Sequence, residues 1–395
     1  MKYFDILMRK IAIVIILLSL VVIGAFFILF DEKKLEIYSS IPADADNKPE
    51  NIKNDNYDIE SQKPLANPPE IIKAVYLTSW SAASPEKLNY IIGLADKTEI
   101  NAVVIDIKDY SGYVAYDINL ESVKKYETKE VRIKKINSLI KKLHDKNIYV
   151  IARTTVFQDP ALGKTRPDLA ISSRAKKSLW TDNNGLSWTD PASKEVWDYN
   201  IAIAKDAASR GFDEINFDYI RFPSDGNLND MDFPFWDEKI PMSEILRRFF
   251  EYLRNQTLGI KISADLFGLS TVQSDDLGIG QIIENAYAYF DYVAPMVYPS
   301  HYASGFLNYK NPADYPYEVV KYSMESAARK LKNYENASGP IIHVSKLRPW
   351  LQDFDLGADY DSKMVKAQIR AVEDLNGWML WNPKNIYTIE ALEVE

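Results

Sequence analysis

The chain has 395 residues, of which 47% are hydrophobic and 12% aromatic, enough for one large buried core or two smaller ones. Its formal net charge of -9 argues against nucleic acid and other anionic polymers as partners, although a local basic patch could override this. The sequence has no Cys, which excludes disulfides and thiolate chemistry, and only 3 His, which argues against a His-based metal site. We therefore expect no metal and no cofactor.

An uninterrupted apolar run stands near the N-terminus. Residues 11–30 contain no charged side chain, and as a helix they would rise about 30 Å, which matches the hydrocarbon thickness of a bilayer. Lys2, Arg9 and Lys10 precede the run, which predicts that residues 1–10 stay in the cytoplasm. A cleaved signal peptide is the alternative, but the run is too long for one and no cleavage motif follows it directly. We expect a single-pass anchor in the cell membrane, with the C-terminal domain outside the cell.

Two regions of different composition follow the anchor. Residues 31–70 are rich in Asp, Asn, Lys, Glu and Pro, which predicts a disordered linker that holds the domain off the membrane. From residue 71 to residue 395, short β-branched and aromatic runs alternate with longer amphipathic segments. We expect strands near 73–79, 102–108, 148–154, 213–219, 260–266, 291–298, 340–346 and 377–381. We expect helices near 85–98, 132–145, 193–209, 242–257, 280–289, 315–333 and 361–374.

This alternation predicts an α/β fold, a (β/α)₈ TIM barrel over residues 71–395, because strands that alternate with helices form a parallel sheet and eight such units close. An open doubly wound sheet is the alternative, but no Gly-rich phosphate loop follows the first strand.

The active site of such a barrel lies at the carboxyl ends of its strands, and alternate residues point inward. In the fourth expected strand, Ile215, Phe217 and Tyr219 form an apolar phase that should face the helices. Asn216 and Asp218 should then point into the barrel, with Asp218 near the mouth.

The same alternation turns acidic residues inward on two further strands. On the fifth strand Asp265 shares the inward phase with Lys261, and on the second strand Asp106 shares it with Lys108. Together with the Asp of the fourth strand, they place three carboxylates at one mouth. Paired carboxylates suit glycoside cleavage, which needs one protonated acid and one ionised group. The alternative is that these acids only form ion pairs with Lys108, Arg153 or Lys261 inside the barrel.

Other residues near the strand ends are of the types expected to support such a site, and the Trp and Tyr among them could stack on sugar rings. The candidate substrate-binding residues are Asn216, Arg221, Tyr298, His301, Trp381, Trp80 and Arg153.

Several stretches of this domain resemble a bacterial family of glycoside-hydrolase-like TIM-barrel domains whose function is otherwise unknown. They span nearly all of residues 71–383, and FDYIRFP and MVYPSHY are the most distinctive. The stretches are KAVYLTSW (73–80), NAVVIDIKDYSGYVAYD (101–117), GFDEINFDYIRFPSDG (211–226), ISADLFG (262–268), YVAPMVYPSHY (292–302) and WMLWNP (378–383). The resemblance implies a TIM barrel and a role on polysaccharide, but it supplies no established catalytic pair.

The sequence departs from the best-known barrel glycosidases, which place Glu at the ends of the fourth and seventh strands. Here the fourth strand ends in Asp218, and the seventh expected strand carries no carboxylate. Acids on strands four and five are closer in layout to the amylase-like barrels, although those use Glu on strand five.

Three functions remain open at this point. The first is a glycoside hydrolase that cleaves cell-wall or extracellular polysaccharide with Asp218, Asp265 and Asp106. The second is a surface protein that binds carbohydrate without turnover. The third, a metal-dependent polysaccharide deacetylase, is disfavoured because the sequence contains no H-x-x-x-H motif.

Overall fold

The computed structural model describes residues 57–338 and 345–394. The expected anchor at 11–30 and the linker as far as residue 56 lie outside these residues. Among the residues described, no helix is long and apolar enough to cross a membrane.

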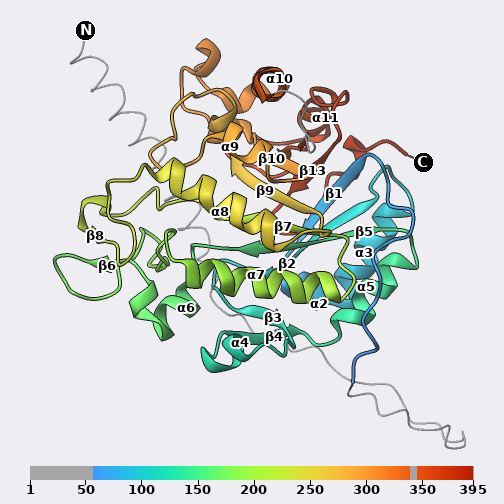
Figure 1. Cartoon of the computed structure of the whole chain (residues 1–395). Coiled ribbons are helices and arrows are strands. Elements are labelled where there is room, and N and C mark those ends of the chain that lie inside the picture. Colours follow the sequence, from blue (N-terminus) through green and yellow to red (C-terminus); the bar gives the residue numbers. More distant parts are fainter. Residues whose placement is uncertain (1–56, 339–344, 395) are drawn as a thin grey trace, which may run out of the picture.

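The described part of the chain forms a closed barrel of eight parallel strands with helices around it (Figure 1). The ring closes because β1 pairs in parallel with both β2 and β13. In chain order the strands are β1 (Ile72–Leu77), β2 (Ala102–Lys108), β5 (Tyr149–Thr155), β7 (Glu214–Asp218), β9 (Ile262–Phe267), β10 (Tyr292–Met296), the pair β11 (Lys346–Leu347) and β12 (Trp350–Gln352), and β13 (Gly377–Trp381). The expected TIM barrel is confirmed.

Each of the seven expected helices is present between the strands. They are α3 (Pro85–Ala95), α5 (Ile136–His144), α7 (Lys194–Ser209), α8 (Met242–Gln256), α9 (Ile283–Tyr287), α10 (Pro316–Ser338) and α11 (Ser362–Arg370). Side-chain caps set several of the starts: the Ser193 hydroxyl accepts from the N–H of Val196 at the start of α7, and Asp361 caps α11 in the same way. In Figure 1, α7 (green) and α8 (yellow) lie side by side over the barrel wall.

Short strands and helices lie in the loops between the barrel elements. Strands β3 (Val114–Tyr116) and β4 (Lys129–Ile133) extend the sheet beside β2, and β6 (Ser172–Ser173) pairs with β8 (Met231–Asp232) in a separate two-stranded sheet. The short helices are α2 (Ser79–Ala83), α4 (Glu121–Lys125) and α6 (Pro160–Thr165).

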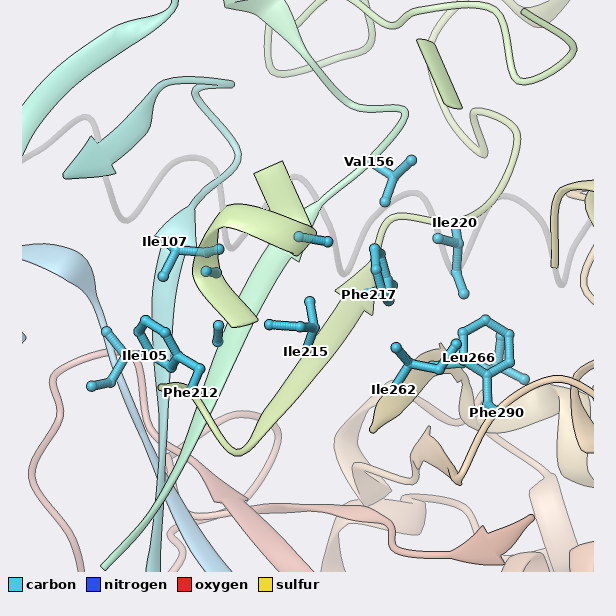
Figure 2. Close-up of a cluster of buried hydrophobic side chains, with 14 of the residues drawn as sticks. Ile105, Ile107, Val156, Phe212, Ile215, Phe217, Ile220, Ile262, Leu266 and Phe290 are labelled. Atoms are coloured by element: carbon cyan, nitrogen blue, oxygen red, sulfur yellow. The ribbon is translucent and has the colours of Figure 1, made fainter. Parts of the chain in front are cut away.

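The buried side chains form two cores that the barrel wall separates. The larger core lies between strands and helices, and Figure 2 shows Ile215 and Phe217 of β7 in it, beside Ile262 and Leu266 of β9. The second core fills the barrel interior, with members such as Tyr76, Val104, Ile151 and Trp350. This division confirms the outward phase expected for β2, β7 and β9, whose alternate apolar residues face the helices.

Lys108 breaks that alternation. A β-bulge shifts the register between β2 and β5, so that Asp106 pairs with Arg153 but Lys108 pairs with Thr154. Lys108 therefore leaves the inward phase: its ammonium lies 2.8 Å from Asp159 and 6.0 Å from the ring of Tyr199 on α7. The expected inward position of Lys108 is wrong, and its charge does not reach the three acids.

The seventh strand also differs from expectation. Residues 340–344, the start of the expected strand, lie outside the described residues. Among the residues described, pairing with β10 occurs at Lys346, Leu347 and Trp350. The described part of the strand extends to Gln352, beyond the expected end at residue 346. Its residues include a proline, Pro349, between β11 and β12, and this weakens the sequence signal of a strand.

The last residues of the expected flexible linker are ordered against the barrel. Asp58 accepts hydrogen bonds from the N–H groups of Asn137 (2.7 Å) and Ser138 (3.0 Å) at the start of α5. Leu65 packs against the interior core, and its N–H donates to Asp213 at 2.6 Å. The linker expected over 31–70 is thus corrected for residues 57–70, which belong to the folded domain.

Candidate active site

One buried guanidinium stands among the three expected carboxylates. Arg153 comes from the inward phase of β5, and its side chain is 7% exposed. Its Nη1 donates to Asp106 Oδ1 at 2.6 Å, its Nη2 donates to Asp218 Oδ2, and its Nε lies 3.8 Å from Asp265 Oδ2. The structure therefore brings Asp106, Asp218 and Asp265 together at one end of the barrel, as the strand pattern predicts.

Asp265 is the most deeply buried of the three acids, at 1% exposure. Its Oδ1 accepts two hydrogen bonds of 2.8 Å, from Asn216 Nδ2 and from the indole Nε1 of Trp350. Its Oδ2 accepts no hydrogen bond from the described residues, and this oxygen is not fully buried. The free oxygen is therefore the one through which Asp265 can exchange a proton.

Asp218 ends β7, where the backbone turns sharply. Both of its carboxylate oxygens accept hydrogen bonds, Oδ2 from Arg153 and Oδ1 from the N–H of Tyr219 at 2.6 Å. Tyr219 has φ 52°, a left-handed conformation that is costly for a bulky residue. The turn fixes the carboxylate of Asp218 in place.

Asp106 lies beside two stacked aromatic rings, those of Tyr76 and Trp381. The phenol of Tyr76 donates to Asp106 Oδ2 at 2.5 Å. The rings of Tyr76 and Trp381 stack with centroids 3.9 Å apart, and the guanidinium of Arg153 lies 5.2 Å from the Trp381 ring. One face of Trp381, a residue expected to bind sugar, is thus already covered by Tyr76.

Burial and mutual repulsion separate these acids electrostatically. Burial, followed by the nearby Asp218 carboxylate, raises the pKa of Asp265 to about 8, although Arg153 lowers it. Burial also raises the pKa of Asp106 to about 6, against the opposing effects of Arg153 and Tyr76. At neutral pH, therefore, Asp265 holds a proton. Carboxyl groups whose surroundings push their pKa values apart are suited to separate acid and base roles.

The remaining candidate residues fall into different surroundings. Asn216 is fully buried and bonds to Asp265 and Ser263, so it positions the acid instead of facing a substrate. Tyr298 is nearly buried beside His301, whose Nδ1 is buried without a partner, and burial lowers the pKa of His301 to about 4. Trp80 is 61% exposed, with the guanidinium of Arg132 5.1 Å from its ring.

Arg221 lies at the rim between β7 and β9. Its guanidinium carbon is 4.7 Å from the ring of Phe267 and 4.8 Å from the ring of Trp188. Among the described residues it forms no ion pair with Asp218, although the Asp218 charge acts on it from a longer distance.

Two residues that touch the acids were not among the expected ones. Tyr76 could have been found, because the alternation test applied to the first strand turns Ala74 and Tyr76 inward. Trp350 could not, because the expected seventh strand ended at residue 346 and did not include it. Lys261, expected to point inward with Asp265, is exposed at the far end of its strand and near none of the acids.

No group of three or more His, Cys, Asp or Glu residues that could hold a metal ion occurs among the residues that the structure describes. The acids instead surround a cation supplied by the chain itself.

A closed (β/α)₈ barrel with carboxylates at the carboxyl ends of its strands is the layout of barrel glycoside hydrolases. Residues 74–387 match the family described as "Putative glycosyl hydrolase domain". The chain belongs to this family, and its enzyme class is glycoside hydrolase. No curated protein matches the sequence.

Three solved structures are similar to this chain. The glycoside hydrolase domain of PgaB (BpsB) from Bordetella bronchiseptica is 14% identical, with a TM-score of 0.58, over 82% of this chain and 99% of that one. A hypothetical protein from Ruminiclostridium thermocellum is 40% identical over 52% of this chain and 98% of that one, with a TM-score of 0.45. The glycoside hydrolase domain of PelA from Pseudomonas aeruginosa is 11% identical over 80% and 96%, with a TM-score of 0.43. The Bordetella structure supports the fold alone.

Proposed function

We propose that this protein hydrolyses O-glycosidic bonds in a cell-wall or extracellular polysaccharide. The observation that carries the proposal is the arrangement of three buried carboxyl groups around one guanidinium at the barrel mouth. One cation cannot neutralise three carboxylates, so an arrangement that served only as a structural ion pair would leave an uncompensated buried charge. A carboxyl group that the guanidinium does not neutralise can serve as the proton donor that glycoside cleavage needs.

In this proposal Asp265 is the acid and Asp218 is the ionised carboxylate. Asp265 has an oxygen without a hydrogen bond that can donate a proton to the leaving glycosidic oxygen. Both oxygens of Asp218 accept from donors, so it acts as an anion that stabilises positive charge at the anomeric carbon or activates water. Both acids lie beside the same guanidinium, which favours a carboxyl separation in the range of about 5 to 9.5 Å that two-carboxylate mechanisms use.

Asp106 then serves the site indirectly. Held by Tyr76 and Arg153, it fixes the guanidinium that faces the other two acids. Its role is to position Arg153.

The test is release of reducing ends from a panel of bacterial polysaccharides by the full-length chain in detergent. We expect release by the wild type, resistance to a chelator, and loss of release in Asp218→Asn and Asp265→Asn. If no polysaccharide is cleaved but one is bound, the protein is a carbohydrate-binding surface protein and the proposal fails. Release of acetate without new reducing ends, abolished by the chelator, would instead indicate a metal-dependent deacetylase.

We also propose that residues 11–30 anchor the protein in the cell membrane with residues 71–395 outside. The support is the length of the uncharged run and the basic residues before it. Protease added to intact cells should remove the domain and leave a short membrane-bound fragment. A mature N-terminus near residue 31 or 46 would refute the anchor.

A further inference from the structure

We infer that Arg221 forms a subsite for a carboxylate on the substrate, next to the proposed cleavage site. The inference deepens the proposed function and rests on it for the place of the subsite. It concerns the class of polysaccharide: one whose sugars carry carboxyl groups.

The first argument is that Arg221 is a buried cation without a direct ion pair: the charges of Asp218, Asp225 and Asp182 act on it, but only from beyond salt-bridge distance. It is 7% exposed, and among the described residues it makes no salt bridge. A guanidinium stays charged even when it is buried. Buried charges are normally paired, so one left unpaired points to a ligand that supplies the missing anion.

The second argument concerns its hydrogen-bond donors. Only Nη1 of Arg221 is used, donating to the carbonyl of Phe222 (3.1 Å) and the hydroxyl of Ser224 (3.2 Å). Neither Nε nor Nη2 bonds to any described residue, and neither nitrogen is fully buried. These two donors therefore remain accessible, and together they form the planar fork that binds a carboxylate through both of its oxygens.

The third argument is rigidity. The guanidinium carbon lies 4.7 Å from the Phe267 ring, 4.8 Å from the Trp188 ring and 5.3 Å from the Tyr219 ring. Rings on several sides hold the fork in one orientation, so little conformational entropy is lost when a ligand binds. Lysine could not be held in this way, because it lacks the flat guanidinium that stacks on rings.

The fourth argument is position. Tyr219 directly follows Asp218, and Phe267 is the last residue of β9, which carries Asp265. A carboxylate bound to Arg221 would thus belong to a sugar next to the scissile bond. Arg153 cannot take this role, because its Nη1 and Nη2 donors already bond to Asp106 and Asp218. The overall charge of -9 disfavours anionic partners in general, and Arg221 is the local exception.

The experiment measures binding to the full-length chain in detergent, by calorimetric or NMR titration. The probes are D-glucuronate and N-acetylmuramate, with D-glucose and N-acetylglucosamine as neutral counterparts and glucose 6-phosphate as a phosphate source. We expect at least one acidic sugar to bind roughly 10- to 100-fold more tightly than its counterpart, as one charge-assisted pair provides. Arg221→Gln should abolish this preference, whereas Arg248→Gln, at an exposed position on α8, should keep it.

Several outcomes overturn the inference. They are equal binding of acidic and neutral sugars, no binding of either acidic sugar at millimolar concentration, binding of glucose 6-phosphate alone, or a preference that survives in Arg221→Gln. If Arg221→Gln does not fold, Arg221→Lys keeps the charge without the fork, and it should retain only part of the preference. Because binding is measured without turnover, a protein that prefers acidic sugars but releases no reducing ends contradicts only the proposed function.

Discussion

Arg153 Nε lies 3.8 Å from Asp265 Oδ2, within ion-pair range, yet no hydrogen bond joins the two atoms. Arg153 instead donates to Asp106 and Asp218. Asp265 is consequently the acid that the guanidinium neutralises least. This asymmetry among the three acids gives each a different expected behaviour on substitution and on changing pH.

The Asp218→Asn variant should lose turnover while keeping its fold. The amide retains the shape of the side chain but cannot act as an anion, so we expect kcat to fall by about 10³-fold or more, as for loss of a residue that stabilises transition-state charge. The melting temperature should stay the same or rise, since active-site charges often cost stability. Asp232→Asn, at an exposed position on β8, is the matched control. Turnover that survives in Asp218→Asn would contradict the assignment.

The pH dependence of stability should reveal the proton on Asp265. Its pKa of about 8 in the folded protein is far above the ordinary value of about 3.9 in an unfolded chain, so the native state binds the proton more tightly. Stability associated with this group is therefore greatest at low pH and is lost as the pH rises toward 8. Asp265→Asn imitates the protonated form and should melt at a higher temperature than the wild type at pH 8. Thermal unfolding of both proteins at pH 5 and pH 8 checks this, and an equal difference at the two pH values would count against it.

The same proton should set the alkaline limit of activity. If Asp265 donates it to the leaving group, kcat/KM falls above about pH 8, where the acid form is depleted. A pH–rate profile on whichever polysaccharide the chain cleaves measures this limb. A profile that is flat through pH 9 would remove Asp265 from the acid role.

Trp350→Phe should move that limb to higher pH. The indole Nε1 of Trp350 donates to Asp265 and lowers its pKa, and Phe keeps a ring there without the donor. Without this bond the pKa of Asp265 rises further, so the fall in kcat/KM should begin at higher pH than in the wild type. Trp378→Phe is the control, because Trp378 lies in the core outside the barrel wall. A purely structural role for Trp350 would lower stability and leave the pH profile in place.

Asp58→Ala should destabilise the domain although residue 58 precedes the barrel. Lys135 at the N-cap position of α5 makes no side-chain capping bond, and Asp58 accepts from the N–H groups of Asn137 and Ser138 instead. Loss of a capping carboxylate costs about 1 kcal/mol in the free energy of unfolding. Chemical denaturation of the full-length chain measures it. Glu60→Ala, an exposed neighbour in the same segment, should have little effect, and equal effects from both variants would mean that the cap is not the cause.

The sequence alone determined the class of fold and the identity of the three acids. Strand and helix alternation and the two-residue period along a strand are local properties, so they can be read without knowing the neighbours. The apolar phase of Ile215 and Phe217 was enough to turn Asp218 inward, and the same reasoning held for Asp265 and Asp106.

Only the tertiary structure decided which residues surround those acids. Arg153 reaches all three because β5 lies between β2 and β7 in the ring, and Trp350 reaches Asp265 across the barrel interior from 85 positions along the chain. The two-residue period of β2 predicts that Lys108 points inward, but a one-residue bulge turns its side chain toward the helices instead. Register, bulges and partners depend on contacts between segments far apart in sequence, and a pattern within one segment carries no information about them.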